Sequence, residues 1–190
     1  NVLKGFGSTD TLYGNDGNDY INGGNGNDTI YGGNGNDTLI GGNGLDSMYG
    51  GYGNDTYQVN HVNDIVVESS SQGTDLIQTS VSYTASVNIE NLTLTGSYSI
   101  NAIGNNLANT LTGNNGNNQL TGGDGNDILL GNNGNDILYG GVGNDEITGG
   151  NGSDIFQIGI GNGRDLITDF NSLEDSIQLL GGLTTNDLSF

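Results

Sequence analysis

The 190-residue sequence has no cysteine, no proline and no tryptophan, and its only basic side chains are Lys4 and Arg164. Without cysteine, the chain forms neither disulfides nor thiolate metal sites. The single histidine, His61, cannot build a zinc site or a Ser-His or Cys-His nucleophile alone. We therefore expect His61 to be a solvent-facing loop residue and the chain to have no catalytic residues. So few basic residues exclude an electrostatic nucleic-acid surface, and no hydrophobic run is long enough for membrane insertion.

Glycine and acidic residues are abundant where a conventional core would need apolar ones. Only 32% of the residues are hydrophobic, 37 are glycine, and 22 acidic residues give a formal net charge of −20. Such a composition is typical of disordered chains. A collagen helix is excluded, because proline is absent and the sequence does not repeat every third residue. The alternatives are a metal-dependent solenoid and a permanently disordered chain. Without metal, both alternatives predict a disordered chain.

The sequence repeats a nine-residue word, of which GGNGNDTIY at residues 23–31 is one copy. The sixth position of the word is Asp or Asn, and the eighth is apolar or aromatic. In a first array the sixth position falls at Asp10, Asp19, Asp28, Asp37, Asp46 and Asp55. In a second array it falls at Asn109, Asn118, Asp127, Asp136, Asp145 and Asp154.

Three glycines in the first six positions disfavour a helix and predict a turn with inward carbonyl oxygens beside the Asp. The three positions after the turn favour a very short strand. If turns alternate between two edges, two words make one coil, and equivalent positions two words apart stack about 4.8 Å apart. Carboxylates at that spacing repel by about 1 kcal/mol in water. Calcium prefers oxygen-only ligands, so we expect calcium ions between successive turns.

The words resemble the nonapeptide repeats of the RTX (repeats-in-toxin, haemolysin-type) calcium-binding family, with the pattern G-G-x-G-x-D-x-U-x. The resemblance implies an all-β fold, a right-handed parallel β-roll. It also implies that the carbonyls of Gly23 and Asn25 bind one calcium, that those of Gly24 and Gly26 bind the adjacent one, and that Asp28 bridges both.

The same offsets give the predicted metal ligands of both arrays. In the first array they are Asp10, Gly14, Asp16, Gly17, Asp19, Gly23, Gly24, Asn25, Gly26, Asp28, Gly32, Gly33, Asn34, Gly35, Asp37, Gly41, Gly42, Asn43, Gly44, Asp46, Gly50, Gly51, Tyr52, Gly53 and Asp55. In the second array they are Gly122, Gly123, Asp124, Gly125, Asp127, Gly131, Asn132, Asn133, Gly134, Asp136, Gly140, Gly141, Val142, Gly143, Asp145, Gly149, Gly150, Asn151, Gly152 and Asp154.

Several of these predictions have alternatives. Asp16 and Asp124 add side-chain ligands or are solvated carboxylates, and Asp165 and Asp175 are further ligands or surface residues. Asn109 and Asn118 lack the charge, so we expect weak or absent sites there. One ion per stacked pair of turns gives roughly eight calcium ions.

Changes in composition predict four segments. Residues 1–58 form a first RTX β-roll block, 59–103 a β-rich connecting segment, 104–157 a second block and 158–190 capping strands. The connecting segment is expected to continue the solenoid with wider coils, with a flexible linker as the alternative. Tyr13, Tyr31 and Tyr49 lie two words apart from one another, which predicts a stacked ladder. Such a ladder either stiffens the sheet or forms a sugar-binding stripe.

Sites with few carboxylates and many neutral carbonyls bind calcium weakly, as extracellular modules do. We therefore expect a secreted or cell-surface module that folds on Ca²⁺ binding outside the cell. Because residue 1 begins inside the pattern, we expect a piece of a longer protein. The resemblance implies a Gram-negative bacterium and export by type I secretion machinery. The alternatives are an adhesive module that binds surface glycans and an accessory C-terminal domain of a secreted protease, lipase or epimerase.

Overall fold

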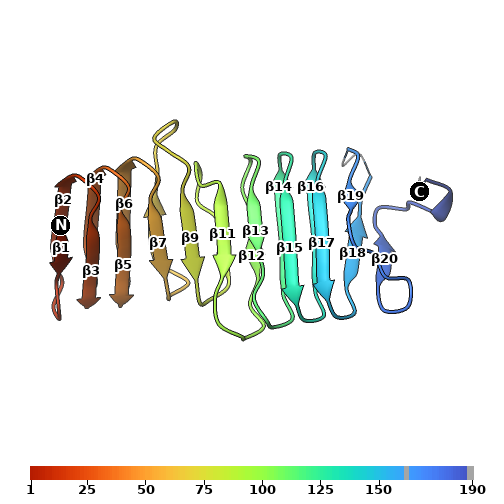
Figure 1. Ribbon diagram of the computed structural model, residues 1–190, viewed down its shortest axis with the longest axis horizontal. Helices are drawn as coiled ribbons and strands as arrows, with labels where there is room; N and C mark the ends of the chain where they lie inside the picture. Colours follow the sequence, from red (N-terminus) through yellow and green to blue (C-terminus); the bar gives the residue numbers. More distant parts are fainter. Residues whose placement is uncertain (161–162, 188–190) are drawn as a thin grey trace. The chain divides into compact units, whose positions relative to one another are not determined.

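A computed structural model describes residues 1–160 and 163–187. The chain divides into two compact units, residues 1–95 and 96–190. Figure 1 labels the strands along the chain. The described residues form strands and one 3-10 helix, η1 at Thr185–Asp187, and contain no α-helix. A search of these residues for a helix able to span a membrane finds none. Residues 161–162 and 188–190 of the predicted capping segment lie outside the described residues.

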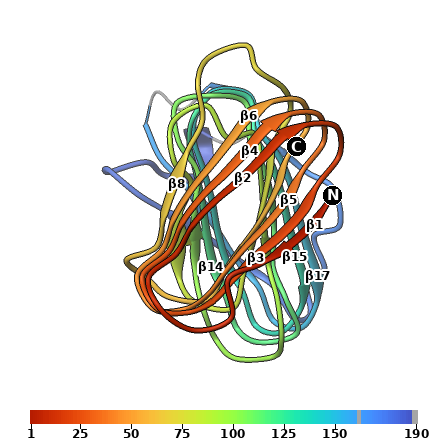
Figure 2. The ribbon, with the colours of Figure 1, turned by 90° about the vertical axis from the view of Figure 1, so that its left-hand side faces the viewer.

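The first unit is a solenoid of parallel strands in two facing layers (Figure 2). In one layer the strand order is β1, β3, β5, β7, β9 and β11, at Val2–Lys4, Tyr20–Asn25, Thr38–Asn43, Thr56–Val59, Leu76–Thr79 and Asn91–Leu94. In the other layer the order is β2, β4, β6 and β8, at Thr11–Asp16, Thr29–Asn34, Ser47–Tyr52 and Ile65–Val67. The short strand β10 lies at Tyr83–Thr84. The predicted all-β parallel solenoid is confirmed.

Two words make one coil, as predicted. In β4 and β6, Thr29 pairs with Ser47 and Tyr31 with Tyr49, a step of two words. The intervening word forms β5 in the facing layer, and β5 pairs with β3 and β7. Every second word therefore lies on the same layer and at the same edge.

The strands are longer than predicted. β4 has six residues rather than three, because it continues from Thr29-Ile30-Tyr31 into the Gly-Gly pair of the next word. Gly24 and Gly26 have positive φ angles of 102° and 128°, and the turn proper is confined to residues 26–28. The prediction that the whole Gly-Gly-x-Gly-x-Asp segment is a turn was wrong, since its first three residues extend the preceding strand.

The core is a column of single side chains from the eighth position of each word. In the first unit these are Ile21, Ile30, Leu39, Met48 and Tyr57, all 0% exposed. Their neighbours on either side point outward because side chains alternate along a strand. This core needs only one apolar residue per word. A chain in which 32% of the residues are hydrophobic can therefore form it.

Within residues 59–95 the strands continue the solenoid, so this part is not a flexible linker. β8 pairs with β6, β9 with β7 and β11 with β9. Asp55 and Asp75, which lie just before β7 and β9, occupy equivalent positions in successive coils and are 20 residues apart. The next step, from Asp75 to Glu90, is only 15 residues. The expectation of wider coils is therefore right for the first of these steps and wrong for the second.

The second unit has the same construction. One layer has the order β13, β15, β17 and β19, at Thr110–Thr112, Ile128–Asn133, Glu146–Asn151 and Leu166–Ile167. The other has the order β12, β14, β16, β18 and β20, at Ala102–Ile103, Gln119–Asp124, Ile137–Val142, Ile155–Ile158 and Ser176–Leu179. Its buried column is Leu111, Leu120, Leu129, Leu138, Ile147 and Phe156. Of the predicted capping strands, β19 pairs with β17 and β20 with β18.

Candidate metal centre

The sixth-position residues form rows along the edges of each unit, one residue per coil. In the first unit, the first acidic row contains Asp10, Asp28, Asp46 and Asp64, and the second acidic row contains Asp19, Asp37, Asp55, Asp75 and Glu90. In the second unit, the third row contains Asn109, Asp127, Asp145 and Asp165, and the fourth contains Asn118, Asp136, Asp154 and Asp175.

Each row is joined by the same hydrogen bond. The backbone N–H of Asp28 donates to Oδ1 of Asp46 at 2.8 Å, and the N–H of Asp10 donates to Oδ1 of Asp28 at 2.8 Å. Each of these carboxylates is thus held by an amide of the preceding coil, through one oxygen only. These bonds fix the position of the carboxylate.

In ten of these carboxylates the other oxygen is buried without a partner among the described residues. In the described part of the chain, Oδ2 has no hydrogen-bond partner in Asp10, Asp19, Asp28, Asp37, Asp46, Asp55, Asp127, Asp136, Asp145 and Asp154. A buried carboxylate oxygen without a partner is strongly unfavourable, and buried charges are normally paired or bound to metal. The recurrence of this atom from word to word indicates a common ligand and not a local defect.

Glycine at the first position keeps space open beside this oxygen. A Cβ on Gly23 would meet Oδ2 of Asp28 and, at 2.6 Å, the carbonyl oxygen of Gly41. The carboxylate oxygen and the carbonyl oxygen of the next coil therefore converge on the same glycine. Hard oxygen donors from carboxylates and backbone carbonyls are the donor set that calcium takes.

Burial of these carboxylates disfavours their charged form. Desolvation raises the pKa of Asp55, Asp127 and Asp136 to about 6, against the lowering effect of the amide donors of the preceding coil. Repulsion from neighbouring carboxylates in the row, such as Asp37 and Asp75 around Asp55, raises the pKa further. Burial also raises the pKa of Asp37, Asp46, Asp145 and Asp154. A divalent cation would remove both penalties.

The third-position carbonyls, predicted as ligands, already take part in the stacking of the coils. The carbonyl of Asn43 accepts the Gly26 N–H at 2.8 Å, and that of Tyr52 accepts the Gly35 N–H at 2.7 Å. Because a carbonyl oxygen has a second lone pair, these groups can still coordinate an ion. The structure brings them to the same turns as the carboxylates, and their coordination stays a prediction.

Third-position side chains point away from these sites. Asp16 and Asp124 are exposed, and Asp16 accepts a hydrogen bond from the side chain of Asn34 at 2.8 Å. Tyr52 and Val142 are 62% and 54% exposed. Asp165 and Asp175, in contrast, continue the third and fourth rows, since they accept the N–H of Asp145 at 3.3 Å and of Asp154 at 3.0 Å.

Four acidic residues of the connecting segment, which the repeat pattern did not predict as site residues, lie in or beside these rows. Asp64 accepts the Asp46 N–H at 3.1 Å, Asp75 accepts the Asp55 N–H at 2.8 Å, and Glu90 accepts the Asp75 N–H at 2.8 Å. Glu68 is buried and accepts a hydrogen bond from the Tyr57 hydroxyl. The spacing of one word from Asp55 to Asp64 could have identified Asp64. The steps to Asp75 and Glu90 are not multiples of nine, so the repeat gave no signal for them.

The tyrosine ladder is confirmed on the layer of β2, β4 and β6. Tyr13 and Tyr31 stack with ring centroids 4.9 Å apart, and Tyr31 and Tyr49 with centroids 4.8 Å apart. His61 lies half-buried in the turn after β7, where its backbone N–H donates to Oδ2 of Asp64 at 3.1 Å. His61 is therefore a loop residue, as predicted, but it is half-buried and not fully solvent-facing.

Buried oxygen rows with a glycine cradle in the coils of both arrays define a calcium-binding β-solenoid. Comparison with protein families finds four copies of the RTX calcium-binding nonapeptide repeat, at residues 4–39, 31–60, 103–138 and 130–167. These matches cover more than half of the chain, which therefore belongs to the RTX calcium-binding repeat family. A search of curated proteins finds no match.

Proposed function

We propose that this chain is a calcium-dependent folding module, in which ions between successive coils hold the solenoid together. The observation that carries the proposal is the series of buried Asp Oδ2 atoms that have no hydrogen-bond partner among the described residues. Without cations, each row places carboxylates of the same charge next to one another. Roughly eight calcium ions would offset most of the formal charge of −20.

Because ligands from different coils meet only in the folded chain, the free energy of calcium binding becomes free energy of folding. Far-UV circular dichroism in chelator, in calcium and in magnesium tests this. We expect disorder in chelator, a strand spectrum in calcium and little effect of magnesium, which gives up its bound waters reluctantly. An unchanged strand spectrum in chelator would contradict the proposal.

We further propose that the module works outside the cell, as part of a larger protein exported by type I secretion from a Gram-negative-type bacterium. Such sites fall in the affinity range of extracellular modules, about 10⁻⁴ to 10⁻³ M, so they would stay unfilled in the cytosol. The chain would leave the cell unfolded and fold on export. A calcium midpoint for folding in the micromolar range or below would argue against this arrangement.

A second candidate function is glycan binding by the exposed side of the Tyr13, Tyr31 and Tyr49 ladder. The observation in its favour is that the rings are stacked in register, with Tyr13 56% exposed. Because the ring faces stack on one another, a sugar would meet the ring edges and hydroxyls on the exposed side. The same stacking stiffens a sheet without any ligand. Glycan-array binding that is unchanged after Tyr13, Tyr31 and Tyr49 are all replaced by Ser would exclude it.

A further inference from the structure

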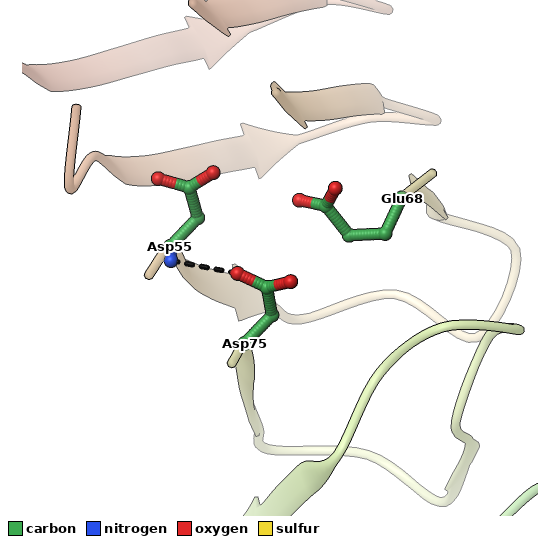
Figure 3. Close-up of side chains that lie close together, drawn as sticks. All are labelled: Asp55, Glu68 and Asp75. Atoms are coloured by element: carbon green, nitrogen blue, oxygen red, sulfur yellow. Dashed lines mark hydrogen bonds between the residues drawn. The ribbon is translucent and has the colours of Figure 1, made fainter. Parts of the chain in front are cut away.

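A group of three buried carboxylates lies at the end of the first array, outside the repeat pattern. Asp55 ends the last nonapeptide turn, whereas Glu68 and Asp75 belong to the connecting segment and lie outside the family matches. One oxygen from each of the three lies within 4.8 Å of the others. Figure 3 shows the carboxylate of Glu68 directed toward those of Asp55 and Asp75.

Glu68 occupies a position that glycine holds in the repeats. In the preceding coil of this edge, a Cβ on Gly32 would meet Oδ2 of Asp37 and, at 2.6 Å, the carbonyl oxygen of Gly50. Gly50 should then meet the residue two words further on, and that residue is Glu68. A Cβ on Gly50 would meet the hydroxyl oxygen of Tyr57, Oε1 of Glu68 and Oδ2 of Asp55. A carboxylate oxygen therefore replaces the neutral carbonyl oxygen of the repeats.

An independent observation shows that this place needs a ligand. Asp55 is 1% exposed, and its Oδ2 has no hydrogen-bond partner in the described residues, although its Oδ1 accepts the Asp37 N–H at 2.7 Å. Oδ2 is thus a buried, unpartnered atom directed at the same glycine as Glu68 Oε1. No lysine or arginine side chain forms an ion pair in residues 1–160 and 163–187, so the chain supplies no side-chain counter-charge.

We propose that Asp55, Glu68 and Asp75 bind an additional calcium ion that the nonapeptide pattern does not encode, and that this ion is the most tightly held in the first unit. The proposal rests on the proposed calcium-binding function, and it adds a specific site to it. Three carboxylates converge here, and calcium affinity rises with the charge of the ligand set. The Tyr57 hydroxyl donates to Glu68 and holds its carboxylate toward the ion.

The second array contains a natural contrast. Phe156 has the word position of Tyr57, and its ring atom Cζ would lie 2.9 Å from a Cβ on Gly149. Phe156 also packs against Phe170, with ring centroids 6.0 Å apart. Tyr57 and Phe156 thus both approach the equivalent glycines, Gly50 and Gly149, but Phe156 has no hydroxyl to orient a carboxylate. Among the described residues, no group of three carboxylates like that of Asp55, Glu68 and Asp75 lies at this end. We expect no tight extra site at this end of the second array.

The test is isothermal titration calorimetry of calcium with the full chain, its Glu68→Gln variant and the control Glu146→Gln. Glu146 is an exposed strand residue, so its substitution removes the same charge away from the cluster. We expect Glu68→Gln to weaken the tightest class of sites at least about tenfold or to remove one ion, and Glu146→Gln to leave both unchanged. Circular dichroism in saturating calcium checks that each variant folds.

A second measurement does not depend on the folding of Glu68→Gln. Terbium, an oxygen-seeking stand-in for calcium, emits when a nearby tyrosine is excited. If the tightest site lies beside Tyr57, the first equivalent of terbium should emit about half as strongly, or less, in Tyr57→Phe as in the unaltered chain. The later equivalents should give the same emission in both chains. Equal first-equivalent emission in both chains would overturn the proposal, as would unchanged calcium number and affinity in Glu68→Gln. If the unaltered chain binds no calcium at all, the proposed function itself is contradicted, and not only the additional site.

Discussion

The backbone N–H of Asp28 donates to Oδ1 of Asp46, 18 residues further along the chain, and leaves Oδ2 of Asp46 buried without a partner in the described structure. One oxygen of the carboxylate therefore serves the stacking of coils, and the other is available for an ion. This division of roles separates the effect of charge from the effect of hydrogen bonding, and it can be tested by substitution.

Asp46→Asn should raise the calcium midpoint for folding roughly tenfold, because the variant keeps the Oδ1 acceptor but loses the charge and one oxygen ligand. The midpoint is measured by circular dichroism during a calcium titration. Asp16→Asn is the matched control, since Asp16 is exposed and lies outside the acidic rows. Equal midpoints for the two variants would contradict the assignment of the rows as metal ligands.

Gly42→Ala should destabilise the calcium-loaded solenoid by about 2 kcal/mol or more, because two effects add there. Gly42 has a φ of 97°, and a Cβ there would collide with the Gly24 carbonyl oxygen. Gly17 has a φ of 101°, but a Cβ there would have no atom within 4 Å. Gly17→Ala should therefore lose only the backbone term, about 1 kcal/mol. Urea unfolding in saturating calcium compares the two, and equal losses would show that close stacking contributes little.

Acid should have opposite effects with and without calcium. The folded-state pKa of Asp55, Asp127 and Asp136 is raised to about 6, so the folded chain takes up protons that the unfolded chain takes up only near pH 4. In chelator, the stability contributed by these groups is then fully present below about pH 4 and is lost as the pH rises through about 6. In calcium, protons compete for the same oxygens, so the calcium midpoint should rise as the pH falls through about 6.

Circular dichroism from about pH 7 to about pH 5 measures both effects. The strand signal should increase in chelator as the pH falls, and the calcium requirement should increase in parallel titrations. A strand signal in chelator that stays constant or falls over this range would show that burial of these carboxylates does not limit folding.

Tyr31→Ser should lower the stability of the calcium-loaded chain by about 1 kcal/mol, because Tyr31 stacks with both neighbours in the ladder. Tyr98, which is 80% exposed, supplies the control substitution Tyr98→Ser. Thermal unfolding in calcium compares the two variants. If the two variants lose the same stability, the ladder does not stiffen the sheet, and that result would favour the glycan-binding alternative.

The nine-residue repeat allowed the stacking of coils to be predicted from the sequence. The coil of two words places Asp28 beside Asp46 and Tyr31 beside Tyr49 without further information. The length of the strands was missed because glycine propensity treats all glycines alike. Gly23 and Gly24 both extend β3, although Gly24 has a positive φ, whereas Gly26 lies in the turn. Only the stacking of coils distinguishes these positions.

Glu68 could not be found from the sequence for a different reason. Its role depends on a coil in which the step from Asp55 to Asp75 is 20 residues, because the loop before Asp75 is longer than a repeat turn. No local pattern predicts that length, and Glu68 taken alone resembles a surface residue. Its distance of two words from Gly50 becomes meaningful only after the coil is known to continue past the last repeat.

The alternation of words between the two layers also restricts how such an array can change in length. Tyr13, Tyr31 and Tyr49 share one layer because an even number of words separates them from one another. A duplication of one word would transfer every later side chain to the opposite layer and break up the ladder. A duplication of two words would add a complete coil and leave all later neighbours in place, so parity, and not length as such, decides which insertions the solenoid tolerates.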